Sequence, residues 1–574
     1  MYALEECRKE ITRELKKVVL RYESTAEVHL EVPPSGMGDF AFPCFSLAVV
    51  AKKSPKNIAE AIAKCIPKNK RVTKIEAAGG YVNFFLDFAS LASSTLQSVL
   101  EKKESYGYLP EKKKKVIIEH TSANPNGPLH VGRARNPIIG DTLVRIFKAA
   151  GFDVESQFYL DDMGKQVAIL AWGVSNLEKT MIPVSEYKKP DHQNVGFYQL
   201  ANQRMESDET VARQIGEMVK KLEHGDRQTI DMIHAAYTPI LDGIKESLSR
   251  INIYIDMYIP ESNFMHDKSV EKVIKELKTT PHCHEEEGAF YLDMEPFGIH
   301  GRNTKFFFLR NDGTTLYATR DIAYHQWKAR QANYLVNVLG EDHKLESKQV
   351  KIALELLHTK VLPHVMFYAF VSLPEGKMST RRGRVVYLDE LIDECIAHAY
   401  EEVKKRRADE LSEDQMKKIA KVVGIGALRY NIIKVQPEKE IQFAWEEALN
   451  FEGNAVPFVQ YAHARACSIL GKAQEKKYTF DATLLNHPSE LALIKQLARF
   501  PLVIDDACSG YKPHLIANYL YETAAAFSQF YRDCPVIPEE NSSLRSSRLT
   551  LVFATKTVLH TALDLLGITA PEEM

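Results

Sequence analysis

The chain has 574 residues, of which 45% are hydrophobic and 26% charged, a balance that is typical of a soluble globular protein and leaves little room for long disorder. This length exceeds what one hydrophobic core usually serves, so we expect about two to four domains. Lys and Arg number 74 against 76 Asp and Glu, for a net charge of −2. Overall charge therefore supplies no attraction for nucleic acid, and any RNA contact must come from local patches.

The N-terminal stretch 1–28 is charged and lacks an apolar core of signal-peptide length, and no later stretch is apolar for long enough to span a bilayer. We therefore expect a cytoplasmic protein that does not contact membranes. The eight cysteines are scattered without Cys-x-x-Cys pairs, so the sequence predicts neither a disulfide framework nor a zinc site. His282-Cys283-His284 is interpreted as a surface loop, because adjacent residues of an extended segment point to opposite faces.

Residues 1–110 are expected to form a small α/β domain. An amphipathic helix near the start is followed by extended segments such as 79–86, and a charged stretch from 101 to 115 is interpreted as a linker. The next unit begins with the apolar β-branched run 116–118, which is suited to a buried parallel strand.

A strand, helix and strand follow one another between 116 and 160. Apolar residues recur every four positions from Ile139 to Phe147, Gly151 stands where a C-terminal cap belongs, and 152–160 predicts a second strand. Such units build doubly wound parallel sheets, in which ligands bind at the carboxyl ends of the strands. The loop 121–132 occupies that place.

The rest of the chain predicts a helical insertion over about 173–285 and then a return to the sheet with the apolar runs 305–309 and 334–339. Beyond the middle of the chain, residues 406–574 are expected to form a separate helical domain.

Two short motifs carry the chemistry. His130-Val131-Gly132-Arg133 lies at the start of a predicted helix, where free N–H groups and the helix dipole favour phosphate and where Gly132 lets a nucleotide approach the backbone. Much later, Gly376-Lys377-Met378-Ser379-Thr380 lies in a Gly- and Arg-rich loop, where a lysine could neutralise a pyrophosphate leaving group. Each motif alone is a weak signal, since His130 could equally be an ordinary loop histidine.

In this order and on these elements, the two motifs resemble the His-Ile-Gly-His and Lys-Met-Ser-Lys signatures of class I aminoacyl-tRNA synthetases. The chain departs from both signatures. Arg133 replaces the second histidine and keeps a cation, whereas Thr380 replaces the final lysine and removes one. Lys377, or the neighbouring Arg381 and Arg382, must then supply that charge.

The sequence from Glu119 through Asn124 and on to Asp141 resembles that of the arginyl branch of this class. The segments 38–40 and 79–85 are similar to the N-terminal tRNA-binding domain of arginyl enzymes, and 427–430 is similar to the opening of their anticodon-binding domain. The resemblance implies a multidomain α/β fold with a small N-terminal α/β domain, a Rossmann-type doubly wound parallel sheet with a helical insertion, and an all-α C-terminal anticodon-binding bundle. The expected bounds are 1–110, 111–405 and 406–574.

The resemblance also implies an activity, that of an arginine–tRNA ligase that uses ATP with Mg²⁺ and no dedicated protein metal site. Its partners would be L-arginine and tRNA(Arg), tRNA would bind before activation, and we expect a monomer. The implied catalytic residues are His130, Lys377 and Arg133.

The other implied site residues fall into three groups. A guanidinium needs carboxylates and carbonyls that accept a fork of N–H bonds. The arginine-binding residues implied are Glu119, Ser122, Asn124, Tyr317, Asp321 and Glu341. The ATP-binding residues implied are Ala123, Asn124, Pro125, Leu129, His130, Gly132, Arg133, Gly340, Asp342, Met378 and Ser379. Tyr461 is the implied anticodon-stacking residue.

Structural and functional alternatives stay open at this point. Tyr317 and Asp321 could form an exposed helical turn with an ion pair to Arg320 or Arg310, and Glu119 could face solvent. A synthetase for glutamate would need cations where this chain has carboxylates. The Arg133 and Thr380 departures allow a catalytically silent, synthetase-like tRNA-binding protein. A small nucleotidylyltransferase would lack the two outer domains.

Overall fold

The computed structural model describes residues 2–22, 27–34, 36–373, 376–377, 380–381, 384–442, 445–450, 453–475 and 478–574, without side chains at 302, 372–385 and 443–446. Within these ranges, no helix is both long and apolar enough to cross a membrane.

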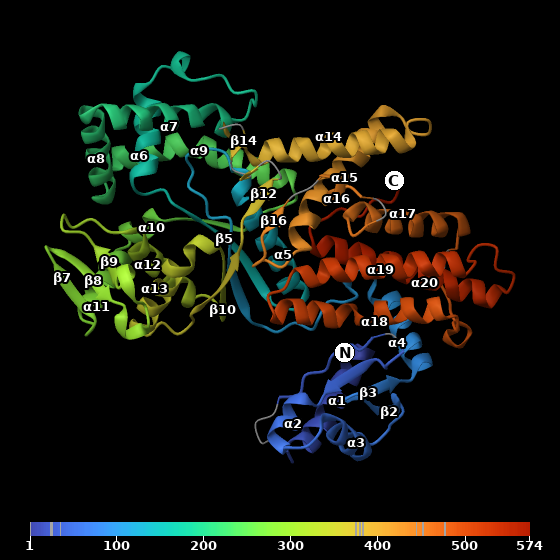
Figure 1. The fold of residues 1–574 in the computed structure, drawn as a ribbon. Helices are drawn as coiled ribbons and strands as arrows, with labels where there is room; N and C mark the ends of the chain where they lie inside the picture. Colours follow the sequence, from blue (N-terminus) through green and yellow to red (C-terminus); the bar gives the residue numbers. More distant parts are fainter. Residues whose placement is uncertain are drawn as a thin grey trace.

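The N-terminal part (blue, bottom of Figure 1) is a three-stranded antiparallel sheet of order β1-β3-β2 with helices packed on it. Its elements are α1 (Ala3–Val19), β1 (Phe40–Pro43), α2 (Phe45–Ala51), α3 (Pro55–Cys65), β2 (Val72–Ala78) and β3 (Tyr81–Leu86). The helix α4 (Phe88–Lys102) leads away from it. Asp39 closes this unit by accepting a hydrogen bond from Leu86 N at 2.8 Å, and its other oxygen lies 2.6 Å from Lys495 Nζ in the C-terminal part.

A five-stranded parallel sheet of order β11-β10-β4-β5-β6 forms the centre of the molecule, which confirms the predicted fold class. Its strands are β4 (Lys115–Glu119), β5 (Asp153–Leu160), β6 (Met257–Pro260), β10 (Tyr334–Gly340) and β11 (Pro363–Tyr368). The helix α5 (Arg135–Ala149) connects the middle strand β4 to β5, which pairs with it on one side. On its other side β4 pairs with β10, which comes much later in the chain. The strand order reverses between β4 and β10, the place at which such sheets bind ligands.

Between β5 and β6 the chain is helical, as expected for the insertion (upper left of Figure 1). The helices are α6 (Lys165–Asn176), α7 (Pro190–Ser207), α8 (Glu209–Glu223) and α9 (Arg227–Arg250). After β6 come α10 (Ser262–His266), α11 (Ser269–Lys278), β7 (Cys283–Glu286), β8 (Ala289–Asp293), β9 (Lys305–Leu309), α12 (Tyr317–Ala329) and α13 (Lys344–Leu356).

Two expectations about this region differ from the structure. The range of about 173–285 is predicted to be a helical insertion, and the structure places within it β6, an edge strand of the central sheet. The run 305–309 is a strand, as predicted, but it pairs antiparallel with β8 in a separate sheet of order β7-β8-β9. Its alternating burial, with two of its five side chains buried, suits a sheet that is covered on one face.

The C-terminal part is almost entirely helical, as predicted. After the short strands β12 (Val371–Leu373), β13 (Gly376–Lys377), β14 (Thr380–Arg381) and β15 (Arg384–Val385) come α14 (Leu388–Arg407), α15 (Glu413–Ile433), β16 (Ile441–Gln442), α16 (Trp445–Ala448), α17 (Val456–Ala473), α18 (Pro488–Ser509), α19 (His514–Asp533) and α20 (Ser542–Leu565). The short 3-10 turns are η1 (Lys103–Ser105), η2 (Val131–Arg133), η3 (Lys179–Met181), η4 (Glu295–Phe297), η5 (Gly301–Asn303), η6 (Glu341–His343) and η7 (Ala482–Leu484).

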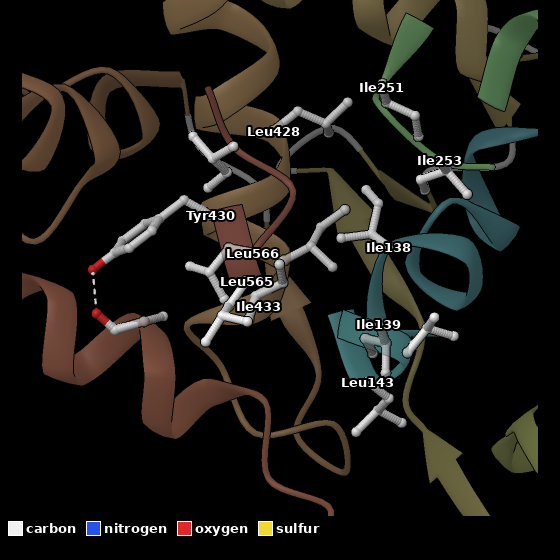
Figure 2. Close-up of a cluster of buried hydrophobic side chains, with 14 of the residues drawn as sticks. Ile138, Ile139, Leu143, Ile251, Ile253, Leu428, Tyr430, Ile433, Leu565 and Leu566 are labelled. Carbon is white, nitrogen blue, oxygen red and sulfur yellow. Dashed lines mark hydrogen bonds between the residues drawn. The ribbon is translucent and has the colours of Figure 1, made fainter. Parts of the chain in front are cut away.

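The helix α5 shares its apolar core with the C-terminal helices. Figure 2 shows Ile138, Ile139 and Leu143 of α5 in one cluster with side chains of α15 and of the end of α20. Beside them the fully buried Arg429 donates to Leu566 O and Ile251 O, both at 2.6 Å, and to Asp141 Oδ2 at 2.5 Å. One guanidinium thus joins α5, the end of the insertion and the C-terminal tail.

Candidate active site

A strained turn follows β4, where the sequence predicted a ligand loop. Thr121 has φ 73° and Ser122 φ 28°, and Ser122 N donates to His120 O at 2.9 Å, which closes a γ-turn of the rarer positive-φ kind. Asn136 of α5 holds this turn by accepting from Thr121 N at 2.8 Å and donating to Val338 O of β10 at 2.9 Å. The end of β4 is therefore fixed against the end of β10.

His130 precedes η2, which leads into α5, so the first motif lies at a helix start as predicted. Burial, and then the nearby charge of Arg133, lower the pKa of His130 below its ordinary value. The imidazole is neutral at pH 7 and can donate a single N–H. Its Nδ1 is buried and has no hydrogen-bond partner among the described residues, Gly132 is buried, and Arg133 is exposed.

The neighbouring strand β10 ends in a second tight turn. A Cβ on Gly340 would lie 2.4 Å from Asp342 Oδ1, so a larger residue here would displace the Asp342 carboxylate. The acidic η6 follows, and Glu346 raises the pKa of His343 above its ordinary value through a hydrogen bond, while Arg133 opposes that shift. The Arg133 charge thus acts on this turn, so the first motif and the 340–343 turn lie close together at the ends of β4 and β10.

Tyr317 and Asp321 begin α12 one turn apart, and both are open to solvent. Tyr317 is 45% exposed and the side chain of Asp321 is 32% exposed. Burial alone would raise the pKa of Asp321, but His325, whose Nδ1 lies 3.1 Å from Oδ1, and the charges of Lys328 and His343 hold it below its ordinary value. Asp321 is therefore an ionised acceptor. The ion-pair partner of Asp321 is His325. The sequence had left open an ion pair with Arg320 or Arg310 instead.

Two buried carboxylates beside Tyr317 were missed by the sequence reasoning. Glu261 follows β6, is 1% exposed, and accepts from Tyr159 OH at 3.2 Å. Its Oε1 also lies 3.0 Å from Arg320 Nε, and the Arg320 guanidinium is 5.1 Å from the centre of the Tyr317 ring. Asp161 follows β5, and burial raises its pKa to about 6.

Asp161 and Glu261 share a hydrogen bond, and burial raises the pKa of Glu261 well above its ordinary value, so this pair holds a proton. A bound cation would favour the ionised form of the pair and donate hydrogen bonds to it. The carboxyl-end rule could have found Asp161, which directly follows a predicted strand. Glu261 was hidden, because the strand before it was assigned to the insertion.

Glu119 is buried and makes contacts within the protein that the sequence did not indicate. It is 6% exposed and does not face solvent, and its Oε2 lies 2.6 Å from Nζ of the fully buried Lys328. Its Oε1 accepts from Ser122 Oγ at 3.2 Å. Asn124 donates through Nδ2 to Gln166 Oε1 at 2.8 Å, a contact that ties the loop to the start of α6.

The remaining predicted site residues lie in three segments of the chain. Ala123, Pro125 and Leu129 are buried in the loop between β4 and η2. Glu341 lies in η6, 3.5 Å from Lys344 Nζ. Met378 and Ser379 lie outside the described residues, and only the backbone of Lys377, in β13, is described.

The predicted anticodon residue Tyr461 lies on α17 and is 43% exposed. Arg465 donates to its hydroxyl at 2.7 Å and stacks between it and Tyr531, with the guanidinium carbon 4.6 Å and 4.9 Å from the two ring centres. Two aromatic rings and a cation thus meet on one exposed face, as base stacking requires.

The chain matches three protein-family models in sequence order. The model described as the arginyl tRNA synthetase N terminal domain matches residues 5–86, that of the class I (R) tRNA synthetase catalytic domain matches 95–445, and that of the DALR anticodon binding domain matches 459–574.

Relatives and solved structures match over nearly the whole chain. An arginine–tRNA ligase from Methanocella arvoryzae is 46% identical over 92% of both chains, and one from Methanosarcina acetivorans is 40% identical over 99% of this chain and 100% of its own. The arginyl-tRNA synthetase structure from Thermus thermophilus covers 99% of this chain and 100% of its own, with a TM-score of 0.84 and 28% identity.

Proposed function

This chain belongs to the arginyl-tRNA synthetases of class I, and on that premise we propose which of its residues act at each step. Like its relatives it is an arginine–tRNA ligase, and the use of ATP, generally with Mg²⁺, follows from the class. The observation that carries the proposal is the cluster of carboxyl groups near Tyr317, in which Asp321 is ionised and Glu261 and Asp161 share a hydrogen bond.

The substrate guanidinium would bind to Asp321, Glu261 and Tyr317. Asp321 is ionised and partly exposed, so it can receive the ligand from solvent. Glu261 is buried and shares a hydrogen bond with Asp161, and it would accept a second N–H once it ionises beside the arriving cation. The ring of Tyr317 offers a face to a planar cation, as it already does to Arg320.

The α-amino and carboxylate end of arginine would lie toward the β4 turn, with Ser122 and Asn124 as hydrogen-bonding groups. Glu119 is bonded to Lys328 and Ser122, so it would act by holding Ser122 in place, and it has little capacity left for the ammonium group. Glu341 lies in the neighbouring η6 turn, and its predicted arginine contact stays part of the proposal.

ATP would lie across the ends of β4 and β10. The backbone at Gly132 and Gly340 would allow close approach of the nucleotide, and Arg133 would offer a cation to its phosphates. Neutral His130 can donate one hydrogen bond to an α-phosphate oxygen as charge accumulates there. Lys377 would neutralise the pyrophosphate from the second motif.

The described residues do not offer a convincing protein site for Mg²⁺. Asp191, His192 and Asp389 are the single group of at least three His, Cys, Asp or Glu residues there that could surround an ion. The Lys189 ammonium lies 2.7 Å from Asp389 and 3.5 Å from Asp191, so a cation is already present. We therefore propose that Mg²⁺ would arrive with ATP, where it would supply positive charge to the phosphates, and that the chain has no dedicated metal site among its described residues.

The reaction would proceed in two transfers without a covalent enzyme intermediate. The arginine carboxylate attacks the α-phosphorus of ATP, the bond to the β-phosphate oxygen breaks, and pyrophosphate leaves. A terminal ribose hydroxyl of tRNA then attacks the carbonyl carbon of arginyl-adenylate, and AMP leaves as the hydroxyl proton is released. Positioning and electrostatic stabilisation are sufficient for both transfers.

On the tRNA side, Tyr461 would stack on an anticodon base with Arg465 and Tyr531 beside it. That tRNA binds before activation, that the chain works as a monomer, and that it acts in the cytoplasm stay predictions.

The proposal is tested by aminoacylation of total tRNA with each of the twenty amino acids. We expect label transfer with arginine alone, and a His130→Ala or Lys377→Ala loss of about a hundredfold or more in kcat, on the order of 3 kcal/mol, with tRNA affinity retained. Activity equal to that of the native chain in both variants would reject the assigned roles. No transfer by the native chain would favour the alternative, a catalytically silent tRNA-binding protein.

A further inference from the structure

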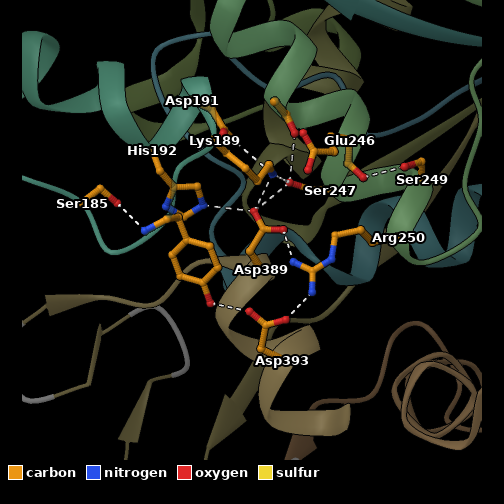
Figure 3. A network of polar contacts seen from close by, with 12 residues as sticks. Ser185, Lys189, Asp191, His192, Glu246, Ser247, Ser249, Arg250, Asp389 and Asp393 are labelled. Atoms are coloured by element: carbon orange, nitrogen blue, oxygen red, sulfur yellow. Dashed lines mark hydrogen bonds and ion pairs between the residues drawn. The ribbon is translucent and has the colours of Figure 1, made fainter. Parts of the chain in front are cut away.

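A buried ion-pair network joins the insertion to the start of α14 (Figure 3). At its centre, the side chain of Asp389 is 1% exposed. Asp389 Oδ2 accepts from Lys189 Nζ at 2.7 Å, His192 Nε2 at 3.0 Å and Ser247 Oγ at 2.9 Å, and Oδ1 accepts from Arg250 NH1 at 2.7 Å. All four donors belong to the insertion, from the start of α7 and the end of α9.

A second carboxylate extends the contact by one helical turn. Asp393 Oδ2 accepts from Tyr187 OH at 2.7 Å, and its other oxygen pairs with Arg250. Burial alone would raise the pKa of Asp389, but the donors His192, Lys189 and Ser247 hold it far below its ordinary value. The carboxylate therefore stays ionised, and the first turns of α14 are held firmly against the insertion.

The same network reaches the first motif through one aromatic ring. The His192 ring packs edge to face on Tyr387, with 5.0 Å between the ring centres. Tyr387 in turn forms an antiparallel backbone bridge with His130. On either side of that bridge, Val131 N donates to Val386 O at 2.9 Å, and Leu388 N donates to Leu129 O at 2.7 Å.

The geometry could also suggest a metal site, because ligand atoms of Asp191, His192 and Asp389 lie within 4.8 Å of one another. The Lys189 ammonium already lies between the two carboxylates. A Cβ on Gly243 would approach the Asp191 carboxyl to 2.3 Å, so backbone closely covers this side of the cluster. An ion-pair network accounts for the arrangement without a metal.

We propose that Asp389 is a positioning residue for adenylate formation. Asp389 joins α7 and α9 to residues 386–389. It thereby fixes the segment that follows the motif 376–380 against the loop that contains His130. The inference rests on the roles proposed above for His130 and Lys377. The two motifs come from distant parts of the chain and must act on the same ATP, and a misplacement of about 1 Å can cost about a hundredfold in rate.

The test compares Asp389→Asn with Glu490→Gln. Both remove the charge of a buried carboxylate, but Glu490, 2.7 Å from Arg548 Nε, lies in α18 away from the motif segments. For Asp389→Asn we expect kcat of tRNA-dependent ATP–pyrophosphate exchange to fall about twentyfold or more, while the KM for arginine and the Kd for tRNA change less than about threefold. For Glu490→Gln we expect a lower melting temperature with native kcat.

A milder variant keeps the test decisive if Asp389→Asn does not fold. Ser247→Ala removes one neutral donor to Asp389 and one acceptor of Lys189 Nζ, and we expect a native fold with kcat lowered about threefold. Native kcat in Ser247→Ala, or equal kcat losses in Asp389→Asn and Glu490→Gln, would overturn the inference. A melting temperature of the native chain that falls on chelation would also overturn it. Absence of arginylation by the native chain would instead reject the proposed function.

Discussion

Replacement of Asp321 by asparagine removes one negative charge from the proposed guanidinium pocket and leaves its shape unchanged. Asparagine can still accept from His325, so the fold should persist. A hydrogen bond to a charged group contributes about 1.5–3 kcal/mol and a neutral one about 1 kcal/mol. The exchange of one bond for the other therefore costs about 0.5–2 kcal/mol, and because the Asp321 side chain is 32% exposed we expect about 1 kcal/mol. This corresponds to about a fivefold lower kcat/KM for arginine.

Arginylation rates are measured over a range of arginine concentrations, with citrulline, the uncharged isostere, as a competitor. The variant should prefer arginine over citrulline less strongly than the native chain does. The surface change Glu276→Gln on α11 is the matched control and should leave both values unchanged. An unchanged kcat/KM for arginine in Asp321→Asn would refute the pocket, and so would equal losses for arginine and citrulline.

Three further predictions concern stability and tRNA. Arg429→Met should lower the free energy of unfolding by about 3–5 kcal/mol in urea denaturation, because it breaks a buried ion pair and frees two carbonyls, and a loss below about 1 kcal/mol would contradict this. Burial lowers the pKa of His120 from 6.5 to about 4. The neutral form of His120 therefore contributes about 3 kcal/mol to the free energy of unfolding above pH 6.5, and this contribution is lost as the pH falls toward 4. An unchanged pH slope in His120→Gln would refute that origin. Tyr461→Ala should raise the KM for tRNA about tenfold with the arginine KM unchanged, and an equal rise in both would argue against stacking.

The sequence predicted the β4, α5 and β5 unit well, because each of these elements carries its own pattern. An apolar β-branched run marked the first strand, and Gly151 marked the end of the helix and the start of the second strand. The edge strand β6 has four residues, one of them buried, so it is too short and too exposed to show a period. The run 305–309 was recognised as a strand but assigned to the wrong sheet, because the residue pattern of a strand does not indicate which other strand it pairs with.

The same limit applies to the candidate site. The sequence placed His130 at a helix start and Asp321 one turn after Tyr317, since both follow from local spacing. It could not show that Glu119 is neutralised by Lys328, because that contact joins residues 209 positions apart. Glu261 was missed for the same reason, since its role depends on where β6 joins the sheet.

The strained turn at Thr121 and Ser122 lowers the stability of the fold and fixes the shape of the loop that follows β4. A β-branched residue at φ 73° costs on the order of 1–3 kcal/mol of folding free energy, which the rest of the fold must offset. The loop that we propose binds the substrate is therefore held in shape before the substrate arrives, so binding would lose less conformational entropy. A substitution that relaxes this turn would raise the melting temperature and slow the enzyme together, so selection for heat resistance alone would act against catalysis here.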